Sequence, residues 1–195
     1  MIKVKNYSLI WAMKRIIEKI CVFMRSLKVK ILYHTKSKVN ILGKVYLNNP
    51  NIKFGNNVTL YPNVHIFGQG TIEIGDNVGI SGATIYARKG IHIGENTCIG
   101  GNCKILDNDF HPIEAETRNK LLRDENGGDS DLVPSKPIYI GKNCFIGCNS
   151  IILKGTVLGD GCVVGAGAVV CGKFEDNCVI AGNPARVIKR LEGNK

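Results

Sequence analysis

An aliphatic side chain returns at every sixth position between residues 138 and 170. The series is Ile140, Ile146, Ile152, Leu158, Val164 and Val170. A second, mostly small series lies two positions ahead of it: Ile138, Cys144, Ser150, Thr156, Cys162 and Ala168. A period of six fits neither an α-helix nor an ordinary alternating strand. It predicts a short strand and a corner that repeat, so that each face of a triangular coil turns one aliphatic side chain inward.

Repeated corner tripeptides support this interpretation. Gly141-Lys142-Asn143 is followed by Gly159-Asp160-Gly161 after 159 − 141 = 18 residues, which is three six-residue steps. Gly, Asn and Asp tolerate the left-handed backbone that tight corners need. Earlier corners are Gly55-Asn56-Asn57, Gly75-Asp76-Asn77 and Gly94-Glu95-Asn96. We therefore expect an all-β solenoid over residues 39–182, with extra residues at some corners and with a short C-terminal helix in 183–195.

A long insertion interrupts the repeat. The corner after Gly94 is expected at 94 + 18 = 112 but appears at Gly141, so 29 residues are added. The polar run over about 112–137 predicts a protruding loop, and a long loop in a compact repeat domain is either disordered or functional. Directly before it stands Asp107-Asn108-Asp109-Phe110-His111-Pro112.

His111 is the candidate general base, because imidazole titrates near neutral pH and can take a proton from a hydroxyl. A lone His is usually structural, so the other three serve as comparisons. None of His34, His65 and His92 lies beside an insertion or a pair of carboxylates.

The net charge of +10 is concentrated in residues 1–38, where ten Lys and Arg face Glu18 alone, giving 10 − 1 = +9. The remaining residues carry 10 − 9 = +1, so neither a basic groove nor a nucleic-acid motif is indicated. Ser8 to about Leu32 has the apolar spacing of an amphipathic helix, with Ser8 as its cap. Charges interrupt every window long enough to span a bilayer. The helix is expected either to lie on an anionic membrane surface or to cover the first coil or a neighbouring subunit.

The eight cysteines contain no CxxC pair and follow no secretory signal, which favours a reduced cytoplasmic compartment, with the helix allowing peripheral contact at the inner membrane face. Cys144 and Cys162 belong to the small inward series and are interpreted as apolar fillers. His65, His92 and His111 lie 27 and 19 residues apart, without the close pair of a three-His zinc site. No metal is expected.

The six-residue repeat resembles the hexapeptide-repeat family, whose fold is a left-handed parallel β-helix; the handedness comes from the resemblance alone. The Asp107-x-Asp109-x-His111-Pro112 run, with the segment 181–189, resembles the sugar O-acetyltransferases of the maltose and galactoside acetyltransferase group. This implies acetyl transfer from acetyl-CoA to a sugar hydroxyl with His111 as base. It also implies that Asp107 or Asp109 fixes the tautomer of His111 or holds the sugar, and that sites are shared between the subunits of a homotrimer.

The same resemblance implies the positions that contact substrates. For coenzyme A they are Phe145, Cys148, Ala166, Cys171, Lys173, Arg186 and Lys189, and for the acceptor Ser81 aligns near a sugar-binding Asn of the galactoside enzymes. The short basic helix is similar to that of acetyltransferases of surface-polysaccharide synthesis. Three alternatives remain open at this point: a serine acetyltransferase-like enzyme, a different short acyl donor, and a non-catalytic scaffold or binding solenoid.

Overall fold

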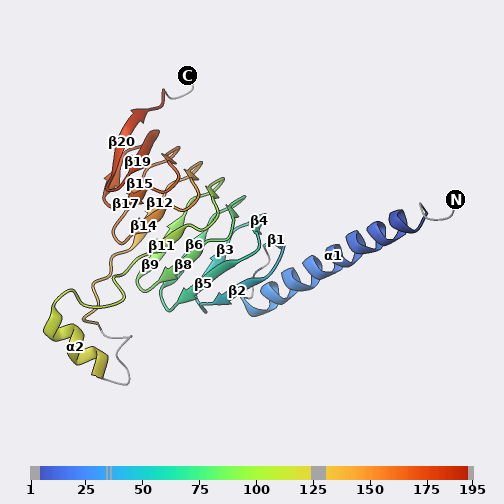
Figure 1. The fold of residues 1–195 in the computed structure, drawn as a ribbon, viewed down its shortest axis with the longest axis horizontal. Coiled ribbons are helices and arrows are strands. Elements are labelled where there is room, and N and C mark those ends of the chain that lie inside the picture. Colours follow the sequence, from blue (N-terminus) through green and yellow to red (C-terminus); the bar gives the residue numbers. More distant parts are fainter. Residues whose placement is uncertain (1–4, 34, 36, 124–130, 193–195) are drawn as a thin grey trace.

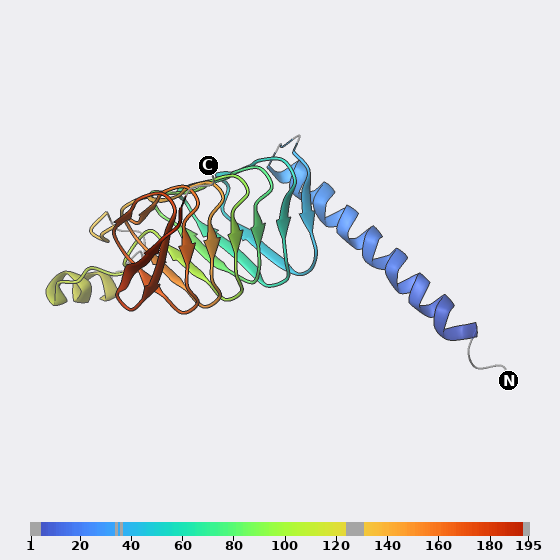
Figure 2. The same cartoon turned by 90° about the horizontal axis from the view of Figure 1, so that it is seen from above.

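The computed structural model describes residues 5–33, 35, 37–123 and 131–192. Three sheets wrap around one core, and each coil contributes one strand to each sheet in turn. Figures 1 and 2 show the coils stacked in one direction, with helix α1 at one end and the last strands at the other. The fold is the left-handed parallel β-helix that the sequence predicts.

The strands of sheet A are β1 (Val39–Ile41), β4 (Val58–Leu60), β7 (Gly79–Ile80), β10 (Cys98–Ile99), β13 (Phe145–Ile146), β16 (Val163–Val164), β19 (Cys178–Gly182) and β20 (Ala185–Arg190). The strands of sheet B are β2 (Val45–Asn48), β5 (Val64–Gly68), β8 (Thr84–Ala87), β11 (Lys104–Leu106), β14 (Ile151–Leu153) and β17 (Val169–Val170). The strands of sheet C are β3 (Ile52–Phe54), β6 (Thr71–Ile74), β9 (Gly90–Ile93), β12 (Ile138–Ile140), β15 (Val157–Leu158) and β18 (Lys173–Phe174).

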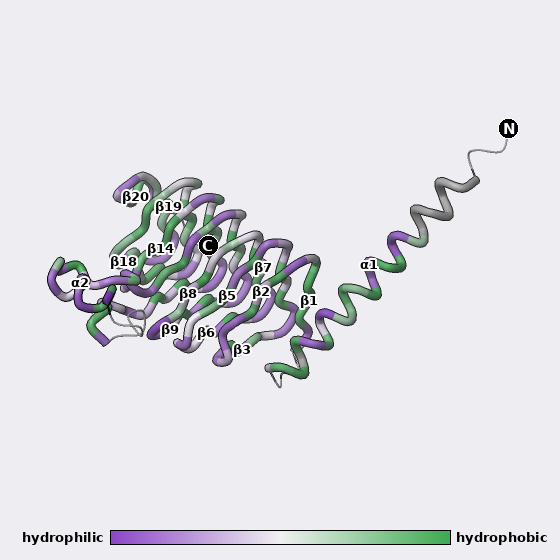
Figure 3. The backbone as a smooth tube through the Cα atoms, turned by 60° about the horizontal axis from the view of Figure 1, so that its bottom comes forward, coloured by the Kyte–Doolittle hydropathy of each residue, from purple (hydrophilic) through white to green (hydrophobic). Residues whose placement is uncertain are grey.

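Both six-residue series point into the core. Ile140, Ile146 and Ile152 are fully buried, and each such side chain contributes about 1.5–3 kcal/mol through burial. The small series is buried as well, and its polar members donate hydrogen bonds to backbone carbonyls, as Ser150 Oγ does to Gly147 O at 2.7 Å. Along the tube in Figure 3, hydrophobic and hydrophilic stretches alternate within each coil. The prediction of an aliphatic core with small fillers is confirmed.

The corner tripeptides stack in one column. Their third residues have positive φ, with 58° at Asn57, 56° at Asn77 and 57° at Asn96. Side-chain amides link them, since Asn57 Nδ2 donates to Asn77 Oδ1 at 3.0 Å and Asn77 Nδ2 to Asn96 Oδ1 at 3.1 Å. The backbones approach so closely that a Cβ on Gly94 would lie 2.5 Å from the carbonyl carbon of Gly141. Packing therefore requires Gly at position 94 of this corner.

Helix α1 spans Lys5–Leu32, so Ser8 lies inside the helix and is not its cap. Figure 1 shows α1 leaving the first coil and projecting away from the stack. Among its described side chains, α1 joins the core at its C-terminal end through Val29, which is 4% exposed, and Tyr33 just beyond it. Among the side chains of α1 that the structure describes, the exposed large apolar ones are Met13, Ile16, Ile17, Ile20, Phe23, Met24, Leu27, Ile31 and Leu32. In a single chain, the first coil therefore leaves most of the described apolar face of α1 exposed. No helix in the described ranges is long and apolar enough to cross a membrane.

Two further expectations need correction. Residues Ala185–Arg190 form strand β20, antiparallel to β19, where a short C-terminal helix was expected. The physical reason is that β20 forms backbone hydrogen bonds with the free edge of β19, and this pairing outweighs any helical preference of the segment itself. The insertion also contains a helix, α2 (Ala115–Arg123), in which Leu121 is buried, and Val133 on the returning segment is buried as well. It is therefore an arm with its own packing and not a bare loop.

Candidate active site

The arm leaves the solenoid after β11, and Asp107 fixes the point of exit. Its carboxylate is fully buried and accepts the backbone N–H groups of Arg88 (2.8 Å), Lys89 (2.7 Å) and Gly90 (2.8 Å) in the coil before. A carboxylate with these donors and no exposed surface cannot also hold a sugar. Asp107 is a backbone anchor, which corrects the expectation that it is a ligand for the acceptor or the partner of His111.

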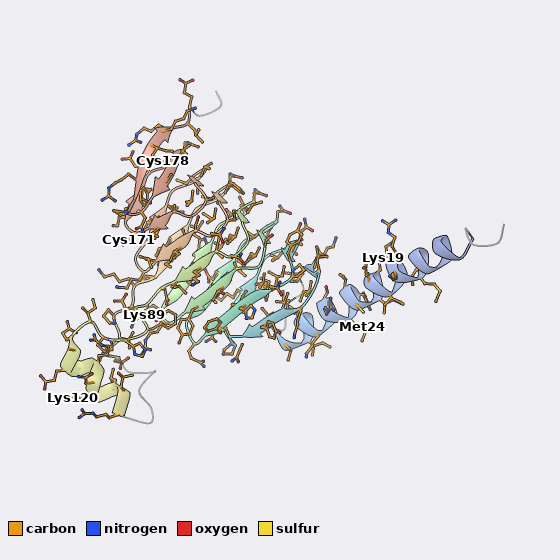
Figure 4. All side chains as sticks on the ribbon, viewed as in Figure 1. Lys19, Met24, Lys89, Lys120, Cys171 and Cys178 are labelled. Atoms are coloured by element: carbon orange, nitrogen blue, oxygen red, sulfur yellow. The ribbon has the colours of Figure 1, made fainter. Side chains whose placement is uncertain are left out.

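The two ends of the arm are tied together at its foot. The N–H of Asp109 donates to Pro134 O at 3.0 Å, the N–H of Lys136 donates to Asp107 O at 2.9 Å, and Asn108 forms an antiparallel bridge with Ser135. These bonds satisfy the backbone groups where the repeat is interrupted. The foot of the arm is therefore a fixed part of the solenoid, as Figure 4 shows where the arm carrying Lys120 meets the coils near Lys89.

A tight turn at this foot presents His111. Phe110 has a φ of 61°, its N–H donates to Asn108 Oδ1 at 2.9 Å, and the N–H of His111 donates to Asp109 O at 2.7 Å. A bulky residue rarely adopts positive φ, and such strain gathers at functional sites. The turn leaves His111 exposed, while Pro112 after it is buried. His111 thus has a braced backbone and an accessible imidazole.

Asp109 forms an ion pair with Lys154, which the sequence reading did not single out. Both side chains are about one quarter exposed, at 25% and 26%, so the pair is partly shielded from water. The second oxygen, Oδ2, is buried and has no hydrogen-bond partner among the described residues. The signal for Lys154 was present in the repeat, because Leu106 and Leu153 are in register and Lys154 therefore stands one coil beyond Asp107.

Residues expected at coenzyme A gather mainly at sheet A and at its corner with sheet B. Cys148 and Ala166 are exposed on successive coils of that corner, where the N–H of Gly167 donates to Cys148 O at 2.9 Å. Phe145 is 51% exposed on the outer face of β13. Ser81 lies at the same corner on an earlier coil, with its N–H donating to Ile99 O at 2.9 Å.

The cationic candidates are divided between two places. Arg186 and Lys189 are exposed on β20, at the edge of sheet A. Cys171 and Lys173 are exposed at the corner between sheets B and C. The arm leaves from the same corner two coils earlier, after β11. One chain therefore carries His111 at one corner of sheet B and Cys148 at the other. It does not bring all of the predicted residues into one pocket.

Comparisons with known proteins agree with this fold. Residues 137–171 match a family model described as the hexapeptide repeat of succinyl-transferase. A variant of AntD, an N-acyltransferase from Bacillus cereus, in complex with dTDP-4-amino-4,6-dideoxyglucose and coenzyme A, superposes with a TM-score of 0.71 at 26% identity, covering 87% of this chain and 90% of that chain.

Two other solved structures are similar. AntD in complex with dTDP and 3-hydroxybutyryl-CoA gives a TM-score of 0.69 at 26% identity, over 87% of this chain and 88% of that chain. NeuO, a polySia-specific acetyltransferase, gives a TM-score of 0.55 at 22% identity, over 80% of this chain and 77% of that chain, and this likeness concerns the fold alone.

The repeat, the stacked corners and these neighbours define a hexapeptide-repeat protein of the left-handed β-helix class. Within that class the chain is an acyltransferase, which confirms the prediction of an enzyme. The coenzyme A bound in the similar structures supports the predicted co-substrate.

Proposed function

We propose that this chain transfers an acetyl group from acetyl-CoA to a sugar hydroxyl in cell-surface polysaccharide synthesis, with His111 as general base. One observation carries the proposal: an exposed imidazole follows a positive-φ turn at the foot of a braced arm. A general base needs an accessible ring and a fixed backbone, and the other described histidines lack this setting. His34 lies outside the described residues.

In the proposed reaction His111 takes the hydroxyl proton as the acceptor oxygen attacks the thioester carbonyl. A backbone N–H stabilises the oxyanion of the tetrahedral intermediate. The C–S bond then breaks, and the imidazolium returns its proton to the departing thiolate. Asp109 is the candidate to orient the base, because its Oδ2 has no partner among the described residues and can accept a ring N–H of His111 after a side-chain rotation.

The donor side of the proposal uses the residues at sheet A. Phe145 offers an apolar face, Cys148 and Ala166 line the corner, and the cations of Arg186 and Lys189 suit the phosphates of coenzyme A. Cys171 and Lys173, at the corner of sheet B that also carries the arm, are assigned to the same donor. The separation of Cys148 and Ala166 from His111 in one chain supports a homotrimer in which the arm of one subunit meets the opposite corner of its neighbour.

The acceptor has a second candidate, because AntD is an N-acyltransferase with a nucleotide-linked amino sugar bound. An amine on such a sugar would give up its proton to His111 in the same way as a hydroxyl. The test is an acetyl-CoA consumption screen that includes neutral sugars, polysaccharide fragments and nucleotide-linked amino sugars. Product analysis by alkaline treatment separates an ester, which is cleaved, from an amide, which survives.

His111→Ala should lower turnover by about two to four orders of magnitude while coenzyme A binding is retained. The matched control is His92→Ala, which removes an imidazole that is also solvent-accessible, 47% exposed on sheet C, where it faces Glu73. Turnover and coenzyme A affinity are measured on all three proteins. Undiminished turnover by His111→Ala would end the proposal for this base.

We also propose that α1 rests on an anionic membrane surface. Met13, Ile17, Ile20, Met24, Leu27 and Ile31 recur at alternating steps of four and three residues and are all at least 40% exposed, so they form an exposed stripe. Among the described residues, its contact with the first coil is confined to Leu27, which lines a cavity with Val22, Val39 and Asn40. Cations Lys14, Arg15, Lys19, Arg25 and Lys28 accompany the stripe with Glu18 as the acid among them. Figure 4 shows Lys19 and Met24 on different sides of α1.

This charge pattern favours a membrane over a second copy, because paired copies of α1 would bring like charges together. Ile17→Ser combined with Met24→Ser should weaken binding to phosphatidylserine vesicles by more than about tenfold, since each buried side chain contributes about 1.5–3 kcal/mol. Val22→Ser is the matched control on the coil side. High salt should also release wild-type protein. If the protein instead self-associates without binding vesicles, and the double substitution abolishes that self-association, then α1 pairs with a second copy of the chain and not with a membrane.

A further inference from the structure

A run of rings crosses the outer face of sheet B and ends beside the candidate base. The rings of Phe67 and Tyr86 lie 4.8 Å apart, and those of Tyr86 and Phe110 lie 4.9 Å apart. On the neighbouring row the rings of Tyr46 and His65 stack at 4.5 Å with an interplanar angle of 26°. We call these five residues the aromatic track. Phe110 precedes His111, so the track leads directly to the proposed reaction site.

The track lies outside the core, which is already filled by the inward side chains of β2, β5, β8 and β11. Tyr46 is 43% exposed and Phe110 is 40% exposed, while the three rings between them are half-buried. Cross-strand ring pairs add some stability to any sheet. The outer face of sheet C differs from this arrangement, because its described outward residues include one looser ring pair, His92 and Tyr139, with ring centres 6.4 Å apart.

The charge of this face is also distinctive. All strands of sheet B lie in the described ranges, and none of their outward side chains is acidic. Lys44 places its ammonium 5.1 Å from the ring centre of Tyr46, and Lys104 is exposed in register with Thr84 of β8. Amphipathic rings with nearby cations and no acid suit a neutral or acidic sugar chain better than a cation.

We propose that the aromatic track binds an extended glycan, so that one sugar unit reaches His111 while further units stack on the rings toward β2. This rests on the proposed sugar acetylation at His111. From β11 to β2 the track crosses three coil steps of about 4.8 Å each, or about 14 Å in all. That span fits a short oligosaccharide and exceeds one monosaccharide. The acceptor is then the end or the interior of a glycan chain, with the rings selecting for chain length.

The test uses two length series from one to six units, malto-oligosaccharides and α2,8-linked sialic acids, with binding measured by calorimetry. For at least one series the wild-type affinity should rise by about tenfold between one and four units, as two stacking contacts would give. Phe67→Ala with Tyr86→Ala should remove most of that gain and leave coenzyme A affinity unchanged. Tyr139→Ala, an exposed aromatic residue on sheet C, is the matched control. If the double variant does not fold, Tyr46→Ala replaces it, because this ring lies at the open end of the stack.

Failure of the track and failure of the proposed function are distinguishable. Binding does not require transfer, so the length series is also measured with His111→Ala, which should keep the same gain. A protein that acetylates monosaccharides through His111 but shows no gain with length in either series would overturn the track alone. The aromatic track would also be overturned if Phe67→Ala with Tyr86→Ala and the control Tyr139→Ala lost the same amount of the affinity gained with chain length.

Discussion

Replacing Asp107 by Asn separates a structural anchor from a substrate ligand. Its Oδ1 accepts the N–H of Arg88 and the side-chain amide of Asn108, and its Oδ2 accepts the N–H groups of Lys89 and Gly90. An amide has one acceptor oxygen, and its NH2 group has no lone pair to offer. In Asp107→Asn, two of the four donors must therefore face another donor within a buried site.

The expected cost follows from these contacts. A buried donor left without its partner costs about 1–3 kcal/mol, so two of them cost about 2–6 kcal/mol, with a central value of about 4 kcal/mol. For a chain of this size 1 kcal/mol corresponds to about 2–4 °C in Tm. Asp107→Asn should therefore lower Tm by about 8–16 °C.

The assay is thermal unfolding followed by far-ultraviolet circular dichroism at two scan rates, because unfolding of a repeat protein can be irreversible. The control is Asp160→Asn, an exposed corner carboxylate whose Oδ1 accepts the N–H of Lys142 at 2.7 Å. An amide oxygen can keep that bond, so Tm should move by less than about 2 °C. A stable Asp107→Asn protein with a raised KM for the acceptor would refute the anchor and restore Asp107 as a sugar ligand.

Two further predictions concern the coils. At pH 8 a thiol reagent should label about four of the eight cysteines in the folded protein; the exposed thiols are those of Cys21, Cys98, Cys148 and Cys171. Burial raises the pKa of Cys103, and a hydrogen bond with Cys162 together with burial raises the pKa of Cys144, so neither thiol ionises at this pH. Labelling of all eight without denaturant would contradict the core. Coenzyme A should slow the labelling of Cys148 and Cys171 but not that of Cys21. Gly94→Ala should lower the free energy of unfolding by about 3 kcal/mol or more, because the new Cβ would lie 2.5 Å from the backbone of the next coil. The control is Gly101→Ala, whose Cβ would meet nothing within 4 Å and should leave the midpoint of chemical denaturation unchanged. Equal midpoints for the two variants would contradict the close stacking of the coils.

The solenoid was predictable because its contacts repeat. A residue in one coil touches its equivalent about 18–20 positions further on, so packing demands the same kind of side chain at each step, as from Ile146 to Val164. The corner residues obey the same logic, since Asn96 and Asn143 each need the left-handed backbone that few other residues accept. In a periodic structure, the contacts between coils can therefore be predicted from the spacing of residue types in the sequence.

The ends and the arm do not repeat, and sequence reasoning failed there for that reason. The strand at Ala185–Arg190 exists because β19 offers an unpaired edge, a fact about the end of the stack that the segment's own composition does not carry. The arm buries Leu121 of its short helix and Val133 of its returning segment, and no period in the sequence marks either position.

The candidate site combines both kinds of information. His111 stood out because the repeat breaks beside it, yet its surroundings come from single, unrepeated contacts. Asp107 and Asp109 are two residues apart, but one side chain turns inward to the preceding coil and the other outward to Lys154, 45 positions away. Both residues lie beyond the end of β11 at Leu106, where the chain turns into the arm, so strand alternation no longer sets their directions. The insertion also separates Asp107 from its equivalent in the next coil, Lys154. Removing the insertion from the count before aligning the coils would have identified Lys154 and shown that Asp107 occupies a corner position, where a buried carboxylate serves the backbone.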